Sequence, residues 1–310
     1  MIYPVDIHEG SPGKSQTGEY LLQMDIAEFY KPDDIEVLIN LLKRYWFELR
    51  MSNKSQKISI ITVTLNSDST IEKTIQSVIN QTYPNIEYII IDGGSTDNTH
   101  DILKNYHEDI DILIIEKDDG IYDAMNKGVK IGSGDFIYFL HSGDLLYEST
   151  VIEKIMEKIN NKNEYDIFYG DFVYYDNEWE EFHSEYRKNK AEILIRGINH
   201  QSMITRASFF KKNGFFNVNN KIYSDFEWLI KAIFENQARI FYLDLPIVYY
   251  LKGGESDQKG KEYHYERSQV IHDHVTWDQL LFFAIKYPLD FYYYVKDIVA
   301  GKVKLRNRSV

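Results

Sequence analysis

The sequence predicts an α/β fold in which helices flank a mixed, mainly parallel sheet. Short apolar runs rich in β-branched residues alternate with amphipathic helical stretches from about residue 57 to residue 160. One of these runs, IEYIIID, is apolar almost throughout, which is typical of a strand covered on both faces. Strands and helices in this order imply right-handed crossovers and a ligand site at the carboxyl ends of the strands.

Composition limits the classes of function. The chain has 310 residues and a mass of 36.7 kDa, which allows one large domain with appendages or two smaller domains. Its 35 basic and 48 acidic residues give a net charge of −13, which argues against general nucleic-acid binding because phosphate backbones attract clustered Lys and Arg. With no cysteine, disulfides and thiolate metal sites are excluded, so any metal ligands must be carboxylates or histidines.

Residues 1–56 are expected to form an addition that precedes the sheet. Residues 1–20 are rich in Gly, Ser, Pro and Thr and indicate a flexible arm. Residues 33–52 form an amphipathic pattern without Gly or Pro, which predicts a helix packed on the main domain or on another subunit of a homo-oligomer. The N-terminus lacks the features of a secretory signal and no apolar stretch approaches membrane-helix length, so a cytoplasmic location is expected.

The first half of the predicted fold contains four strands, KISIITVTLN, IEYIIID, DIDILIIE and DFIYFL. The helix TIEKTIQSVINQTY between the first two strands places its Ile and Val residues on one face. Polar residues stand at or just after the strand ends, namely Asn66, Asp92, Glu116 and Asp144. Each one alone is better explained as a turn or a cap, but the four together favour a binding site.

The second half has a looser pattern. The runs YDIFYGDFVYY and RIFYLDLPIVYYL predict strands, and YSDFEWLIKAIFE predicts a helix between them, so this half should form the second wall of a cleft. Residues 251–310 predict a helical, aromatic segment interrupted by Pro288 and followed by GKVKLRNRSV, a tail with four basic residues. Two interpretations remain open for this segment: contact with an anionic membrane surface, or a core-packed helix with a solvated tail.

Two loop motifs contain residue types that suit phosphate and sugar groups. In DGGSTDNT, residues 92–99, the glycines allow close approach of the backbone, and Ser95, Thr96 and Asp97 are candidate helix caps. In EKDDGIYDAMNKG, residues 116–128, Lys127 could neutralise phosphate oxygens and the carboxylates could hold sugar hydroxyls. The alternatives are an ordinary strand-to-helix turn and an acidic helix start that stabilises the helix dipole.

A third motif, FLHSGDLLY, follows the fourth predicted strand. Its Ser142, Gly143 and Asp144 are compatible with a tight turn that caps the next element, because Gly and Asp tolerate turn geometry. The carboxylate of Asp144 is equally compatible with a metal ligand.

Taken in order, these motifs resemble the family 2 glycosyltransferases of the GT-A fold over about residues 57–235. The resemblance implies a nucleotide-diphospho-sugar transferase-like domain at 57–250, with a nucleotide-sugar half at 57–160 and an acceptor half at 161–250. It also implies inverting transfer of one sugar, of the hexosyl or N-acetylhexosaminyl class, from a nucleotide diphosphate sugar to a hydroxyl. A divalent cation, Mn²⁺ or Mg²⁺, would bridge the diphosphate.

The resemblance also assigns roles to particular residues. Asp144 takes the place of the last carboxylate of the family's Asp-x-Asp metal motif, and Asp225 is favoured over Glu227 as the general base. His200 and Gln201 are expected on the acceptor side, although a satisfied interior histidine is an alternative. The nucleotide base stays open because Asp92 is not followed by a second Asp. The residues expected to bind the nucleotide sugar are Val63, Thr64, Asn66, Asp92, Gly93, Asp119, Asn126, Lys127, Ser142 and Gly143.

Two rival functions remain open at this level. A nucleotidyltransferase would commonly carry a Gly-rich, basic loop after the first strand, which TVTLNSDSTIEK is not. An inactive nucleotide-sugar binding protein is supported by the reduced metal motif. For the main prediction, the absence of membrane helices and of a Gln-x-x-Arg-Trp motif favours a nonprocessive enzyme of surface polysaccharide or glycoconjugate synthesis, acting on a saccharide, a lipid-linked saccharide or a glycoprotein.

Overall fold

The computed structural model describes residues 56–175, 180–187, 189–251, 264–289, 292 and 295–296. All of them belong to one compact unit, Gln56–Val310. The predicted N-terminal arm and helix and the basic tail lie outside the described residues.

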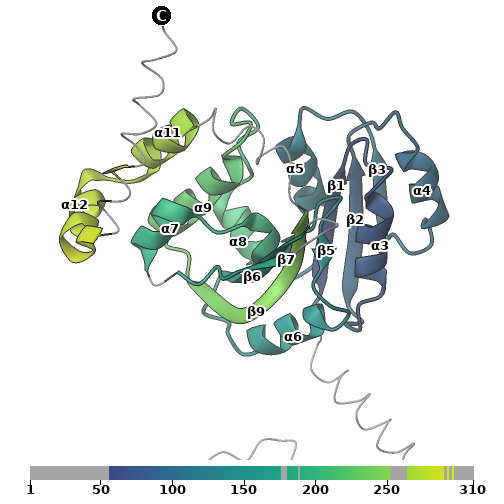
Figure 1. Ribbon diagram of the computed structural model, residues 1–310, viewed down its shortest axis with the longest axis horizontal. Coiled ribbons are helices and arrows are strands. Elements are labelled where there is room, and N and C mark those ends of the chain that lie inside the picture. Colours follow the sequence, from purple (N-terminus) through teal and green to yellow (C-terminus); the bar gives the residue numbers. More distant parts are fainter. Residues whose placement is uncertain are drawn as a thin grey trace, which may run out of the picture. The chain divides into compact units, whose positions relative to one another are not determined.

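A nine-stranded sheet forms the centre of this unit (Figure 1). Its first four strands in the chain run parallel in the order β3-β2-β1-β4, and the sheet continues through β8, β6, β9 and β5, with β7 paired to β6. The strands are β1 (Ile58–Thr64), β2 (Ile86–Asp92), β3 (Ile112–Ile115), β4 (Phe136–Phe139), β5 (Leu145–Leu146), β6 (Ile167–Tyr175), β7 (Glu180–His183), β8 (Met203–Arg206) and β9 (Ile240–Leu251). The predicted α/β fold with a mixed, mainly parallel sheet is therefore confirmed.

Helices cover both faces of the parallel strands, which explains why these strands are apolar almost throughout (Figure 1). On β1, alternate residues point to opposite faces: Ile58 and Ile60 join one core, while Ile61 and Val63 join the other. The first core includes α3 (Ile71–Ile79) and α6 (Val151–Ile159), with a contribution from α4 (Thr99–Asn105). The second includes α5 (Ile121–Ile131), α8 (Ala207–Asn213) and α9 (Ser224–Phe234).

The strand direction reverses between β4 and β8, and this reversal positions the site. The two strands are antiparallel neighbours, with Tyr138 opposite Ile204. The chain leaving β4 therefore lies beside the chain entering β8, which is the short 3-10 helix η2 (His200–Ser202). Residues that follow the fourth strand are in this way brought beside residues some 60 positions later in the chain.

The C-terminal helices add a third, smaller core. It joins α7 (Lys190–Arg196) and α9 to α11 (His264–His274) and α12 (Trp277–Lys286). The helix α12 begins with a capping box between Thr276 and Gln279, and Phe283 faces the core. Among the helices that the structure describes, none has the length and apolar character required to span a bilayer.

Candidate functional site

The carboxylate of Asp92 organises the loop that follows β2. The side chain is fully buried, and it accepts hydrogen bonds at 2.6–2.9 Å from the N–H groups of Gly94 and Ser95, the Ser95 hydroxyl and His100 Nε2. Burial raises the pKa of this carboxyl, but the hydrogen bonds outweigh burial and hold the pKa below its ordinary value. Contacts with the loop and with His100 of α4 thus fix the Asp92 carboxylate, and its contact with the nucleoside stays a prediction of the family resemblance.

The end of β1 lies beside this loop. Asn66 has a φ of 50°, its Oδ1 accepts the N–H of Thr96 at 2.8 Å, and its own N–H donates to Ser95 Oγ at 2.7 Å. Val63 and Thr64 are buried, and the Thr64 hydroxyl has no hydrogen-bond partner among the described residues. A buried hydroxyl without a hydrogen-bond partner costs free energy, and a hydrogen bond from Thr64 to a ligand atom would remove that cost.

Gly93 lets the second loop motif approach the first. A Cβ at this position would lie 2.5 Å from Asp118 Oδ2, so glycine is required for that carboxylate to lie where it does. Asp118 Oδ1 in turn accepts the N–H of Gly120 at 2.9 Å. The motifs at 92–99 and 116–128 therefore meet at the carboxyl ends of β2 and β3.

Among the predicted helix caps in the first motif, Asp97 contacts the start of α4, but the N-cap residue of this helix is Asn98, which makes no side-chain capping hydrogen bond. The Oδ1 of Asp97 accepts the N–H of Thr99, the first residue of α4, at 3.0 Å. Ser95 instead binds Asp92, and Thr96 binds Asn66, so the expected capping by these two residues is wrong. Their hydroxyls are used to join the loop to β1 and β2.

Lys127 lies in α5 between two acidic side chains. Its Nζ is 2.9 Å from Glu116 Oε1 and 3.1 Å from Asp123 Oδ2, and these partners raise the pKa of the lysine, Glu116 more strongly. The lysine therefore stays charged at neutral pH and joins the end of β3 to α5. Asp119 is exposed beside this group, and its carbonyl accepts Lys221 Nζ at 3.2 Å.

Asn126 has a structural position. The residue is buried, its Nδ2 donates to the carbonyl of Phe216, and its Oδ1 accepts the N–H of the same residue, both at 2.9 Å. The nitrogen and the oxygen of the Asn126 amide both form hydrogen bonds with the backbone of Phe216. Asn126 therefore holds α5 to the second half of the fold. The nucleotide-sugar contact that the resemblance implies for Asn126 stays a prediction.

Residues Ser142, Gly143 and Asp144 form the turn between β4 and β5. Ser142 Oγ lies 2.8 Å from Ser67 Oγ, and Gly143 has a φ of 101°, a conformation that favours glycine. Asp144 is 4% exposed, and its Oδ1 accepts the N–H of Leu251 at 3.1 Å. The expected turn is therefore present, with its single carboxylate tied to the end of β9.

The donor set for a divalent cation is small. No group of three or more His, Asp or Glu side chains able to enclose a metal ion occurs within the described ranges. The carboxylate of Asp144 and the hydroxyl of Ser142 fit an oxygen-preferring ion that takes its other ligands from a diphosphate and from water. They do not form a self-sufficient protein cage.

Asp225, at the start of α9, is held by contacts on both carboxylate oxygens. Its Oδ1 accepts the Tyr122 hydroxyl at 3.0 Å and the N–H of Phe226 at 2.8 Å, and its Oδ2 lies 2.7 Å from His200 Nδ1. Burial raises the pKa of Asp225, but the hydrogen bonds from His200, Phe226 and Tyr122 outweigh burial, so the pKa lies below its ordinary value. Two residues predicted separately, Asp225 and His200, are thus brought together in one ionisable group.

His141 belongs to the same group, and the sequence assigned it no role. Its Nε2 lies 2.9 Å from His200 Nε2, although the residues are 59 positions apart. Burial lowers the pKa of His141 well below its ordinary value, so the ring is neutral at pH 7. The carbonyl of His141 also accepts the N–H of Asp144 at 3.0 Å, so this residue links the Asp144 turn to the Asp225 group. The signal that could have identified it is its place immediately before Ser142 at a strand end.

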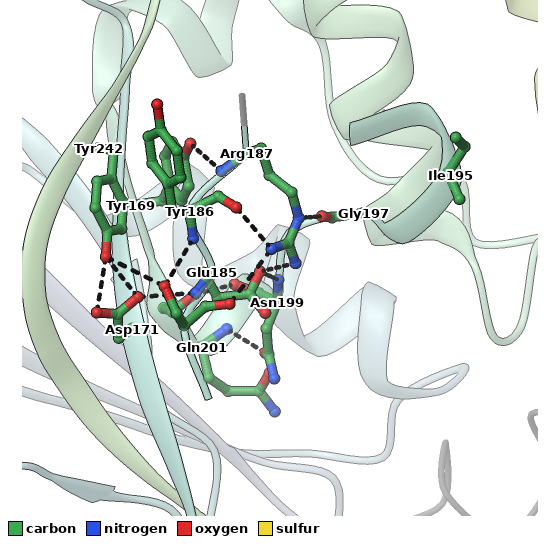
Figure 2. A network of polar contacts seen from close by, with 12 residues as sticks. Tyr169, Asp171, Glu185, Tyr186, Arg187, Ile195, Gly197, Asn199, Gln201 and Tyr242 are labelled. Carbon is green, nitrogen blue, oxygen red and sulfur yellow. Dashed lines mark hydrogen bonds and ion pairs between the residues drawn. The ribbon is translucent and has the colours of Figure 1, made fainter. Parts of the chain in front are cut away.

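A buried polar network supports the backbone on either side of His200 (Figure 2). Arg187 donates from Nε to the carbonyl of Gly197 at 2.9 Å and pairs with Glu185 at 2.8 Å. Glu185 Oε2 also accepts the N–H of Asn199 at 3.2 Å, directly before His200. The network therefore fixes the segment that carries His200 to the chain after β7.

Gln201, on the other side of His200, is also held through its backbone. Its N–H donates to Asn199 Oδ1 at 3.0 Å, and its carbonyl accepts the hydroxyl of Tyr138 at 2.7 Å. The residue is 6% exposed. His200 is thus anchored from both sides, and its ring is the part of the segment that faces Asp225.

The first half of the fold consists of parallel strands that end in polar loops. A strand reversal joins it to a second half, which carries the hydrogen-bonded pair of Asp225 and His200. This arrangement defines an enzyme of the GT-A fold. The chain belongs to glycosyl transferase family 2: the sequence model of that family matches residues 59–232, more than half of the chain. The protein is therefore a glycosyltransferase, as the motifs predicted, and the nucleotidyltransferase alternative is wrong.

Relatives and solved structures agree with this assignment. A "PGL/p-HBAD biosynthesis glycosyltransferase" of Mycobacterium tuberculosis is 30% identical over 200 residues, which cover 63% of this chain and 77% of the relative. The fold is similar to TarS of S. aureus in complex with UDP-GlcNAc, with a TM-score of 0.59, 18% identity and 79% of each chain covered. A mannosyltransferase of Pyrobaculum calidifontis in complex with GDP-Man and Mn²⁺ has a TM-score of 0.52 at 13% identity, over 84% of this chain and 82% of that one.

Proposed function

We propose that the protein is a nonprocessive, inverting glycosyltransferase that moves one sugar from a nucleotide diphosphate sugar to a hydroxyl acceptor. The observation that carries this proposal is the environment of Asp225. It is a carboxylate at the start of a helix, held by Tyr122 and His200, at the place where the two halves of the fold meet. An inverting displacement needs such a group to take the proton of the attacking hydroxyl.

The carboxylate is ready to act as a base at neutral pH. Its pKa lies below the ordinary value, because the hydrogen bonds from His200, Phe226 and Tyr122 outweigh the effect of burial, so the group is ionised. The two hydrogen bonds at Oδ1 occupy that oxygen, whereas among the described residues Oδ2 has one partner, His200. We infer that the acceptor hydroxyl donates its hydrogen bond, and then its proton, to Oδ2.

The donor is proposed to bind at the carboxyl ends of β1 and β2. Thr64 offers a buried hydroxyl without a partner in the described part of the chain, and Gly93 leaves the space that Asp118 of the second loop motif occupies. Lys127 offers a positive charge at the end of β3. Asp92 acts indirectly in this proposal, because it shapes the loop from a buried position.

A divalent cation is proposed to act with Asp144. Ser142 and Asp144 would each offer an oxygen, and the diphosphate would complete the coordination, as the small protein donor set requires. When bound, such an ion neutralises charge that develops on the leaving diphosphate. Mn²⁺ in the GDP-Man complex of the Pyrobaculum calidifontis mannosyltransferase supports this proposal by fold analogy.

The cell process is proposed from the relatives. The mycobacterial relative is named for PGL/p-HBAD biosynthesis. TuaG of Bacillus subtilis, 36% identical over 110 residues that cover 34% of this chain and 43% of the relative, is named for teichuronic acid biosynthesis. Both names favour glycoconjugate or surface polysaccharide synthesis, with a saccharide, a lipid-linked saccharide or a glycoprotein as the acceptor.

A lipid surface is proposed as a further contact. Trp277, Leu281 and Ile285 are spaced four residues apart on α12 and are 81%, 59% and 75% exposed, respectively. Residues at this spacing share one helix face, and Lys286 lies on the same helix. Together with the four basic residues of the C-terminal tail, this face suits an anionic membrane interface.

The decisive experiment is a screen of nucleotide sugars. Each sugar nucleotide would be added with and without Mn²⁺ while the thermal midpoint is measured, because a ligand of the folded state raises it. Stabilising donors would then be offered with saccharide, lipid-linked saccharide and glycoprotein acceptors, with mass spectrometry of the product. A product one sugar heavier supports the proposal. Donor binding without transfer or hydrolysis to any acceptor would favour an inactive binding protein.

A further inference from the structure

The two histidines of the Asp225 group form one hydrogen-bonded pair. Their Nε2 atoms are 2.9 Å apart and their ring centroids are 4.9 Å apart. At the other end of the pair, His200 Nδ1 is 2.7 Å from Asp225 Oδ2. Three side chains from three separate segments are therefore joined in a row, His141, His200 and Asp225.

The position of each proton in this row follows from the partners. Asp225 is ionised at neutral pH, so Oδ2 is an acceptor and His200 Nδ1 must carry the hydrogen that lies between them. At the other contact a single hydrogen must lie between the two Nε2 atoms. Either His200 is neutral and accepts it from His141, or His200 is an imidazolium that donates it.

Burial decides between these two arrangements. His141 is 8% exposed, and its Nδ1 is buried without a hydrogen-bond partner among the described residues. If His200 donated, the proton of neutral His141 would have to sit on that Nδ1 as a buried N–H with no acceptor, which is costly. The favoured arrangement therefore has the proton of His141 on Nε2, donated to a neutral His200.

We propose that His141 is a positioning residue for sugar transfer, because its Nε2–H holds the His200 ring in place with Nδ1–H directed at Asp225. This inference rests on the proposed function of Asp225 as the base. The ionisable groups that face the His200 ring are His141 and Asp225, and Tyr122 contacts Asp225 in turn. The charge of Asp225 also raises the pKa of Tyr223, where burial is the larger cause.

Loss of the His141 donor would release this orientation. Without that contact the His200 ring is free to turn away from the carboxylate, and its proton can then move to Nε2. Asp225 would lose one of its fixed contacts and with it the direction of Oδ2. The donor-binding loops do not depend on that contact, so turnover should fall while donor binding persists.

Two variants at position 141 distinguish the effect of the Nε2–H hydrogen bond from the effect of side-chain volume. His141→Gln keeps an amide N–H donor near the position of Nε2, whereas His141→Leu keeps side-chain volume without a donor. The Leu variant is expected to lose about tenfold in kcat, the rate equivalent of one hydrogen bond, with the donor KM within about threefold of the original. The Gln variant is expected to recover most of the loss, whereas equal loss in both variants, or a raised donor KM at unchanged kcat, would overturn the proposal.

A spectroscopic measurement tests the same proposal without turnover. Long-range ¹H–¹⁵N spectra of the full chain, with ¹⁵N-labelled histidine and with His200 assigned by its loss in His200→Gln, report which ring nitrogen carries the proton. We expect the Nδ1–H form of His200 in the original protein at neutral pH and a shift toward Nε2–H in His141→Leu. An imidazolium, or an Nε2–H form, in the original protein would overturn the proposal. Because these spectra need no acceptor, absence of transferase activity would contradict the proposed function and leave the positioning test intact.

Discussion

At the scale of single residues, the two acidic side chains at the start of α9 have different surroundings. Asp225 faces His200 and Tyr122, whereas Glu227 accepts hydrogen bonds from Asn217 and Asn220 at 3.1 Å. Glu227 also lies 3.6 Å from His274 of α11. The first carboxylate therefore belongs to the site, and the second joins the helix to its neighbours.

This contrast gives a matched pair of variants. Asp225→Asn should retain donor affinity, because the donor loops lie at β1 and β2, but should lose about 10²–10⁴-fold in kcat because an amide cannot take the acceptor proton. Glu227→Gln removes the other charge on the same helix and should leave kcat within about threefold. Calorimetry of donor binding and initial rates of transfer check both variants. If Asp225→Asn lost donor affinity instead, Asp225 would belong to the donor site.

Sequence reasoning and structure differ most at this scale, because a sequence shows residue types but not their partners. The resemblance selected Asp225 and His200, which the structure brings together. It also selected Asp92 and Asn126, whose polar atoms turn out to be satisfied by nearby backbone and side-chain groups. His141 could not be found in advance, since its contact with His200 depends on a strand pairing formed far along the chain.

At the scale of elements, the close approach of α5 to β1 is a testable feature of the packing. A Cβ on Gly128 would lie 2.4 Å from Cγ2 of Ile61, a fully buried side chain. Gly to Ala inside an exposed helix normally stabilises by about 1 kcal/mol. Here we expect Gly128→Ala to lower the free energy of unfolding by about 1–3 kcal/mol, because the helix must move off the sheet. Urea unfolding measures it, and Lys130→Ala on the exposed side of the same helix should change it by less than about 0.5 kcal/mol. Stabilisation by Gly128→Ala would show that the helix can shift freely.

Element prediction from sequence succeeded where periodicity is strong. The four parallel strands and the helix α9 were expected from their apolar patterns and are present. The short strands β5, β7 and β8 were not predicted, because LL, EEFH and MITR contain no apolar run of four residues, whereas β3 and β4 consist of such runs, ILII and FIYF. The strand β8 pairs antiparallel with β4 and so positions the site. Because β8 was not predicted, the geometry of the site could not be predicted from the local sequence pattern.

The exposed face of α12 gives a prediction that concerns this element alone. Replacing Trp277, Leu281 and Ile285 by Ser removes apolar area that would enter a lipid interface, so binding to vesicles with anionic lipid should fall by at least about tenfold. Phe182→Ser with Phe215→Ser, which removes exposed aromatic rings from β7 and from the loop after α8, should leave binding unchanged. Co-sedimentation with vesicles measures both. Equal sedimentation of the triple variant and the original protein would refute the membrane proposal.

At the scale of the whole molecule, one buried carboxylate joins three segments at the amino ends of the parallel strands. The candidate site lies at the carboxyl ends of the same strands. Glu87 of β2 is 5% exposed and accepts hydrogen bonds from Lys57, Ser59 and Ser133 at the amino ends of β1 and β4. Burial raises the pKa of this carboxyl, but its hydrogen-bond partners, Lys57 first, outweigh burial and lower the pKa from 4.5 to about 2. The folded protein therefore holds the charged form more tightly than the unfolded chain does.

The stability that Glu87 contributes should depend on pH in a defined window. Because its folded pKa is lowered, the contribution is fully present above the unfolded value near 4.5 and is lost as the pH falls toward about 2. The shift corresponds to about 3 kcal/mol at pH 7, and Glu87→Gln should lose a similar amount there. Guanidinium unfolding from pH 7 down to pH 3 should show the stability difference between the original protein and the variant narrowing below pH of about 4.5. A difference that stays constant across this range would mean that Glu87 stabilises the sheet by packing and hydrogen bonding rather than through its charge.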